Sequence, residues 1–354
     1  MPRLLRRTGL LALLALFSLS LGCASDRMVI DNANQMHGQL QPAVMEDPVL
    51  SGYVQTLGDR VIAVARELDR SDPGSKGHTS GENNQWMFSG IRFHLVNSKT
   101  LNAFTTGGKH VYLYTELFRS CKTEDEFAAV VAHEYAHIYC RHVHNSYNRA
   151  ITVQAVALGA ALAASQIEDQ SLALGIAGLA VVGGQLVALD FNREDEDEAD
   201  AEGFRFYVRA GWDPQQFAGF FQTMIDQGND SGPVILSSHP SLSSRVEKAR
   251  KRAATLPPVA RQWQSRNTAS PRQFQLLQAR AEQVGRTMPT DASLEQAQTL
   301  LAAFPSCVSP QQTPEQLRAR DQLLLNYGTP EQQQAVKQQQ ARRQQPKAKR
   351  RPDE

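Results

Sequence analysis

The sequence has few cysteines and no marked excess of charge of either sign. Its 354 residues include four cysteines, too few for a disulfide scaffold, and no two of them form a CxxC pair. A cysteine-rich zinc ribbon is therefore excluded, and any bound metal needs histidine and carboxylate ligands. The formal net charge is +1, which provides no electrostatic footprint for nucleic acid. We therefore expect no nucleic-acid partner.

The N-terminus has the pattern of an export signal. Three arginines precede an uncharged apolar stretch of 14 residues, 9–22, which is shorter than the roughly 20 residues of a permanent membrane helix. Gly22 directly before Cys23 resembles a bacterial lipoprotein signal, although Ser20 occupies a position where leucine is usual. We predict a signal peptide over residues 1–22 and lipidation of Cys23. Cleavage without lipidation, giving a soluble periplasmic protein, is the alternative.

Two further segments have unusual composition. Residues 151–189 are rich in Ala, Leu, Val and Gly and predict an apolar helical hairpin, buried or lying against lipid. A true membrane-spanning pair is the alternative, because the last 18 residues of this segment carry no charge. Residues 331–354 are rich in Gln, Lys, Arg and Pro and predict a disordered basic tail.

Alternating and capped patterns predict a small sheet followed by a helix. Apolar residues alternate with polar ones from Ile91 to Val96, and a second β-rich run covers residues 109–114. Thr123 and Glu126 have capping-box spacing ahead of an apolar-periodic run. The sequence therefore predicts two strands and a helix from about residue 123 to about residue 142.

The predicted helix carries the motif HExxH, formed by His133, Glu134 and His137. Histidines four residues apart lie on one helix face, so both imidazoles can reach one cation. Glu134 can then take a proton from a water that the metal acidifies. A catalytic zinc site needs a third protein ligand, which must come from elsewhere in the chain.

An acidic segment, 194–200, follows the apolar hairpin and contains Glu196 and Asp200. With HExxH, its ExxxD pattern resembles the HtpX and CAAX-prenyl-protease family of membrane-associated zinc peptidases. The resemblance implies one Zn²⁺ per chain, held by His133, His137 and Glu196. Glu196 and Asp200 are one helical turn apart, so Asp200 can accept the free ring N–H of a ligand histidine. The other acidic residues of the segment are predicted to be solvated.

Further matches extend the resemblance from about residue 97 to about residue 249. Two segments resemble the family's edge strand, to which substrate adds as a further strand. We expect both to bind substrate: Asn102, Ala103 and Phe104, and then Val111, Tyr112 and Leu113. A Gly-Trp-Asp-Pro sequence at 211–214 resembles a family helix start.

His239 and Arg245 resemble the family's HP-then-arginine element. His239 is expected to stabilise the oxyanion or to occupy the open zinc position in a latent state, and capping of the next helix is the structural alternative. Arg245 is expected to orient a carboxylate or a carbonyl, unless it lies on the surface of its basic helix.

Together these features predict a mainly helical α+β, gluzincin-type zinc peptidase domain with a small sheet beside the HExxH helix. The predicted divisions are the signal peptide, the peptidase domain at 23–255, a helical C-terminal extension at 256–330 and the tail.

The expected function is zinc-dependent endopeptidase activity at the periplasmic face of the outer membrane, on misfolded or stalled envelope proteins. The alternative is a chaperone-like outer-membrane assembly factor with a latent zinc site.

Overall fold

The computed structural model describes residues 26–71, 84–148, 191–227, 241–265 and 268–304, with isolated positions between 318 and 340. Several predicted features lie outside the described residues: the signal segment 1–22, Cys23, the apolar hairpin 151–189, His239 and most of the tail. The described helices are α2 (Asp26–Leu40), α3 (Pro48–Ser71), α4 (Thr115–Ser120), α5 (Glu124–Tyr139), α8 (Arg193–Arg209), α9 (Gly219–Asp226), α10 (Leu242–Ala254), α11 (Pro271–Thr287) and α12 (Ala292–Ala303).

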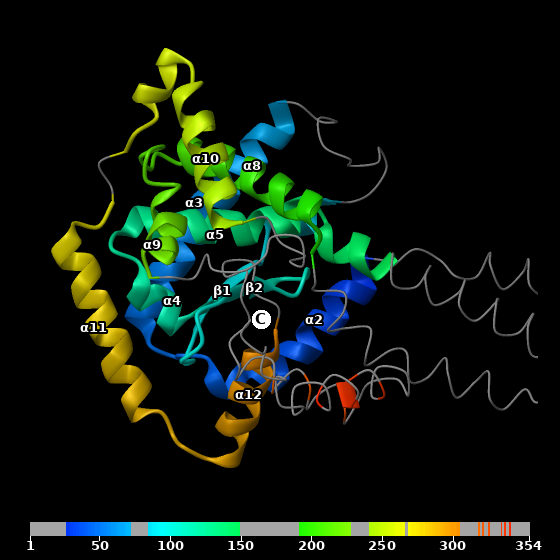
Figure 1. Ribbon diagram of the computed structural model, residues 1–354. Helices are drawn as coiled ribbons and strands as arrows, with labels where there is room; N and C mark the ends of the chain where they lie inside the picture. The colour runs from blue at the N-terminus through cyan, green and yellow to red at the C-terminus, as the bar shows by residue number, and fades with distance from the viewer. Residues whose placement is uncertain are drawn as a thin grey trace, which may run out of the picture.

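A three-stranded sheet lies beneath the central helices in Figure 1. Its strands are β1 (Arg92–Val96), β2 (Ala103–Thr105) and β3 (His110–Tyr114), in the order β1-β3-β2. β1 pairs with β3 in parallel and β2 pairs with β3 antiparallel. The two predicted strands are confirmed as β1 and β3, and the mainly helical α+β class is confirmed with them.

The prediction that Val111, Tyr112 and Leu113 belong to an edge strand is wrong. These residues pair with β1 on one side and with β2 on the other, which leaves β3 in the centre of the sheet. The physical reason is the glycine turn at Gly107, whose φ of +74° reverses the chain and folds β2 back onto β3. The edge on this side of the sheet is therefore β2.

α5 is the central helix, and nearly every residue along it is buried. Thr123 caps it by accepting a hydrogen bond from the Glu126 N–H, as predicted, while the Glu126 carboxylate accepts from the N–H of Lys122 instead of returning to Thr123. α3, α8 and the sheet all contact α5. α8 approaches closely because Gly203 lies against the backbone of His133, where a Cβ would come within 3.1 Å of the His133 Cα.

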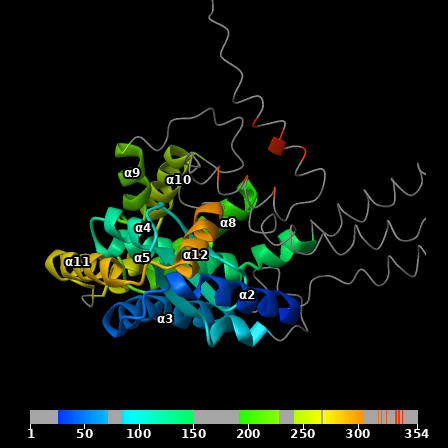
Figure 2. The ribbon, with the colours of Figure 1, turned by 90° about the horizontal axis from the view of Figure 1, so that it is seen from below.

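The remaining helices enclose this centre. Seen from below, α2 and α3 lie on one side, α9 and α10 on the other, and α5 between them (Figure 2). The predicted helix start at Asp213 and Pro214 is wrong, since residues 214–218 form turns and α9 begins at Gly219. Hydrogen bonds from the Asp213 N–H to Asp125 and from Tyr207 to the Asp213 carbonyl hold the chain in this tighter path.

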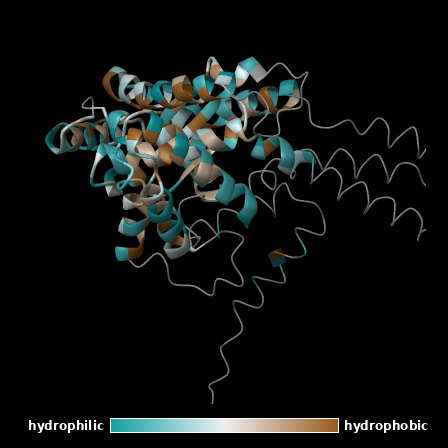
Figure 3. Ribbon diagram, turned by 90° about the horizontal axis from the view of Figure 1, so that it is seen from above, coloured by the Kyte–Doolittle hydropathy of each residue, from teal (hydrophilic) through white to brown (hydrophobic). Residues whose placement is uncertain are grey.

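The helices of the predicted extension pack on the same core as the helices of the predicted 23–255 domain. Phe274 of α11 is buried and meets Phe118 edge-on with ring centroids 5.1 Å apart. Helices throughout the molecule carry both apolar and polar residues along their lengths (Figure 3), as amphipathic helices do. Across the described ranges, none of the helices combines the length and the apolar character that crossing a bilayer requires.

Candidate metal centre

α5 and α8 bring two imidazoles and one carboxylate to a common point. The Nε2 atoms of His133 and His137 are 3.1 Å apart. Glu196 Oε2 lies 3.6 Å from His133 Nε2, and Glu196 Oε1 lies 3.5 Å from His137 Nε2. All three side chains are fully buried. Glu196 lies in the first turn of α8, which begins at Arg193 after a capping box formed by Asn192 and Asp195.

This arrangement fits a divalent metal ion. Tetrahedral zinc with bonds of about 2.0–2.1 Å separates its ligand atoms by about 3.3 Å, close to the spacings among His133, His137 and Glu196. Two histidines and a glutamate are a typical donor set of catalytic zinc sites, which keep a fourth position for water or substrate.

Asp200 and Arg245 support the first histidine. Asp200 Oδ1 is 3.0 Å from His133 Nδ1, so Nδ1–H donates to the carboxylate and the Nε2 lone pair faces the common point. Arg245 donates to both Asp200 oxygens, at 2.6 and 2.8 Å. Burial alone would raise the pKa of Asp200, but Arg245 and His133 hold it well below its usual range.

Arg245 is buried, not exposed on its basic helix. Its guanidinium lies over the Phe221 ring and 3.6 Å from Glu196 Oε2. Arg245 was expected to orient either a carboxylate or a carbonyl, and its contacts are with the carboxylates of Asp200 and Glu196.

A second chain of hydrogen bonds, which the sequence did not predict, supports His137. His142 Nδ1 lies 2.9 Å from His137 Nδ1, and His142 Nε2 lies 3.3 Å from Glu198 Oε2. If His142 donates to Glu198, its Nδ1 accepts from His137 and leaves the His137 Nε2 lone pair for a metal. Arg141, with φ of +59°, ends α5 and turns His142 back towards the motif.

Glu198 is 41% exposed, as predicted of a solvated residue, and its Oε2 lies 3.3 Å from His142 Nε2. The prediction for Asp195 is wrong. Asp195 is buried, and its carboxylate accepts from the Asn192 N–H as part of the helix cap. Asp197 binds Lys248 at the surface, as expected of a solvated residue.

Glu134 directly follows His133 on α5 and is enclosed by protein. Its side chain is fully buried, and within the described part of the chain neither carboxylate oxygen has a hydrogen-bond partner. Burial raises the pKa of Glu134 to about 8, with the positive charge of Arg245 acting in the opposite direction. Burial likewise lowers the pKa of His133 to about 4, which keeps that imidazole neutral.

The predicted substrate segments lie near α5 but are partly covered. β2 contacts α5, and Asn102 Nδ2 donates to the carbonyl of Phe304 at 3.3 Å. The Phe104 ring stacks on the Phe304 ring with centroids 4.0 Å apart. The end of α12 therefore lies against the face of β2, and His239 lies outside the described residues.

Comparisons with known proteins agree with this geometry. Residues 83–253 match the family model "Peptidase family M48". The chain is 31% identical over 216 residues to a beta-barrel assembly-enhancing protease of Yersinia pestis, covering 60% of this chain and 40% of that protein. It is 30% identical to the protein of that name from Escherichia coli strain K12, covering 61% and 41%. A mitochondrial metalloendopeptidase of Schizosaccharomyces pombe is 31% identical over 160 residues, 44% of each chain. The chain thus spans about two fifths of the length of the bacterial relatives that it matches.

Proposed function

Since residues 83–253 form a domain of peptidase family M48, we propose that the protein is a zinc-dependent endopeptidase of the bacterial cell envelope. The observation that carries this proposal is the convergence of His133, His137 and Glu196 beside Glu134, whose carboxylate has no hydrogen-bond partner among the described residues. The names of the bacterial relatives support a role on envelope proteins.

In this proposal His133, His137 and Glu196 hold one Zn²⁺. When bound, the ion supplies Lewis acidity, which polarises a peptide carbonyl and lowers the pKa of water. Glu134 takes the proton from the attacking water and later transfers it to the leaving amine. Because no described residue forms a hydrogen bond with either Glu134 oxygen, both are available for that proton.

The supporting residues keep the ligands oriented. Asp200 holds His133 in the tautomer that presents Nε2, and Arg245 fixes Asp200 by two parallel hydrogen bonds. His142 does the same for His137. His239 is proposed to stabilise the oxyanion or to close the fourth zinc position, and Ala103 and Phe104 of β2 to bind substrate.

Activity should depend on Glu134 while zinc content should not. In the Glu134→Gln variant, cleavage of an unfolded protein such as casein should fall at least about 100-fold, the contribution of a general base, with zinc retained. Glu196→Gln should lose zinc, whereas Glu194→Gln, an exposed change on the same helix, should keep both zinc and activity. Equal cleavage by wild type and Glu134→Gln would favour a chaperone-like assembly factor instead.

We also propose that lipidated Cys23 anchors the protein to the outer membrane and that misfolded or stalled envelope proteins are its substrates. Mass spectrometry of the mature N-terminus tests the anchor. Wild type should begin at an acylated Cys23 and remain in the membrane fraction after carbonate extraction, while Cys23→Ala should be released. An unmodified N-terminus would contradict the anchor without affecting the peptidase proposal.

A further inference from the structure

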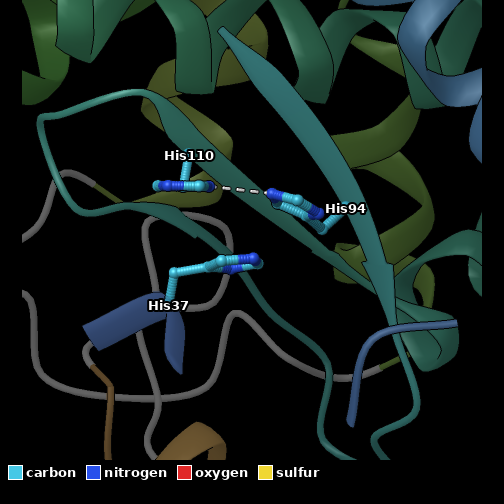
Figure 4. A group of neighbouring side chains, drawn as sticks. All are labelled: His37, His94 and His110. Atoms are coloured by element: carbon cyan, nitrogen blue, oxygen red, sulfur yellow. Dashed lines mark hydrogen bonds between the residues drawn. The ribbon is translucent and has the colours of Figure 1, made fainter. Parts of the chain in front are cut away.

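Three histidines outside the HExxH motif converge beside the sheet (Figure 4). His37 comes from α2, His94 from β1 and His110 from β3, and one ring nitrogen from each lies within 4.8 Å of the other two. His94 Nε2 is 2.9 Å from His110 Nδ1. The His37 ring stacks against both, with centroids 4.6 Å from His94 and 4.2 Å from His110.

Neighbouring polar groups direct the nitrogens of this cluster. Asn34 Oδ1 lies 3.1 Å from His110 Nε2, so that Nε2–H donates to the amide oxygen and His110 Nδ1 keeps its lone pair. The Tyr112 hydroxyl lies 3.0 Å from His37 Nδ1; when Nδ1–H donates to that oxygen, His37 Nε2 keeps its lone pair. Second partners of this kind fix the tautomers of metal-binding histidines.

The cluster is also neutral, as metal ligation requires. Burial, together with the neighbouring imidazoles, lowers the pKa of His94 to about 3 and the pKa of His110 to about 4. Burial lowers the pKa of His37 as well. Lone pairs are therefore available at neutral pH without the removal of a proton from an imidazolium.

We propose that His37, His94 and His110 bind a divalent transition-metal ion of the class to which Zn²⁺ and Cu²⁺ belong. Imidazole ligands suit these ions, and the site shares no residue with the His133, His137 and Glu196 group. A tetrahedral ion needs nitrogens about 3.3 Å apart, so the His94 and His110 nitrogens must separate slightly. The half-buried His37 turns about its side-chain bonds to complete the set.

The position of the site gives it a structural role. α2 lies directly against the turn before β3, where a Cβ on Gly108 would come within 2.4 Å of Ala33. The first residue of α2, Asp26, is held by Arg141 at 2.6 Å and by Trp86 at 2.9 Å. A metal at His37 would secure the other half of the helix to both β1 and β3. The group of three contains no carboxylate to act as a base, which argues against hydrolysis there.

Zinc stoichiometry of the untagged full chain tests this proposal. After dialysis against low-micromolar free Zn²⁺, wild type should hold two ions per chain by metal mass spectrometry, and His37→Ala should hold one. The affinity of the second site should fall by on the order of 100-fold or more, since even partners of ligands contribute 10- to 100-fold. Gln39→Ala, an exposed change on the same helix, is the matched control and should keep both ions.

The outcomes separate this site from the proposed active site. One ion in wild type and none in His37→Ala would support the histidine cluster while contradicting zinc binding by HExxH. An unchanged zinc content and affinity in His37→Ala would overturn the proposal and leave the cluster as packed, hydrogen-bonded rings. His110→Asn provides a second variant, which should lose the same ion with an unchanged circular dichroism spectrum.

Discussion

Asp200 contacts His133 on one side and the buried Arg245 on the other. Asp200→Asn removes the charge that compensates Arg245, and breaking a buried ion pair in this way costs about 3–5 kcal/mol of unfolding free energy. Zinc affinity should fall by about 10- to 100-fold, because the His133 tautomer is no longer fixed. Chemical denaturation and zinc titration measure the two effects.

The matched control for Asp200 is Asp197→Asn on the same helix. Asp197 binds Lys248, and both side chains are substantially exposed, at 39% and 41%, so this pair contributes at most about 1 kcal/mol. Similar losses in both variants would mean that Asp200 has no special relation to the site.

His142 offers a second prediction at the scale of single residues. His142→Ala should lower zinc affinity by about 10- to 100-fold, since His137 loses the partner that orients it. Glu198→Gln should have a much smaller effect, because the glutamine carbonyl can still accept from His142. Zinc titration of both variants is the measurement, and an unchanged affinity in His142→Ala would assign His142 a packing role only.

Helix α11 makes a prediction at the scale of elements. Phe274 is buried against Phe118 and Phe127, so Phe274→Ala should destabilise the protein by about 3–5 kcal/mol. Leu276 lies on the same helix but is 63% exposed, and Leu276→Ala should change stability by less than about 0.5 kcal/mol. Urea denaturation measures both. If Phe274→Ala proved harmless, α11 would be an appendage that contributes nothing to the peptidase core.

The predictable elements are those whose signals are local. Thr123 marks the start of α5 through its own cap, and the alternation around Phe93 identifies β1. β2 is only three residues long, too short for a period-two pattern, and its pairing depends on the turn at Gly107. The edge assignment of β3 was wrong for that reason, because strand order is a non-local property.

The site residues, too, were predictable where their signal is local and unpredictable where it depends on the fold. His133 and His137 lie in one helix, so their spacing alone predicts that they converge. The ExxxD pattern indicated Glu196 and Asp200, and the structure places Glu196 with the two histidines and Asp200 against His133. The contact of His142 with His137 was not predicted because the motif helix was expected to run to about residue 142, whereas α5 ends at Tyr139 and the positive φ of Arg141 changes the path of the chain. The cluster of His37, His94 and His110 joins three elements, and no single segment of sequence carries its signal.

At the scale of the whole molecule, metal removal should lower thermal stability. A ligand that binds only the folded state at about 1,000 times its Kd adds about 4 kcal/mol, and each kcal/mol shifts the Tm of a domain this large by about 2–4 °C. Chelation also leaves the buried carboxylate of Glu196 facing two imidazoles without a cation. A fall on the order of 10 °C or more is therefore expected when wild type in micromolar zinc is treated with a chelator.

The fall in Tm on chelation, measured for single variants, shows how much each of the two proposed sites contributes. Thermal scans need no enzymatic activity, so inactive variants can be compared. Glu134→Gln should keep the whole shift, since it removes no ligand. Glu196→Gln should lose the part due to the site between α5 and α8, and His37→Ala the part due to the site between α2 and the sheet. These residues belong to different elements and share no partner in their metal groups, so the two losses should add in the double variant. A Tm that chelation leaves unchanged in wild type would contradict metal binding at both places, whereas a shift lost entirely in Glu196→Gln would leave zinc at the site between α5 and α8 alone.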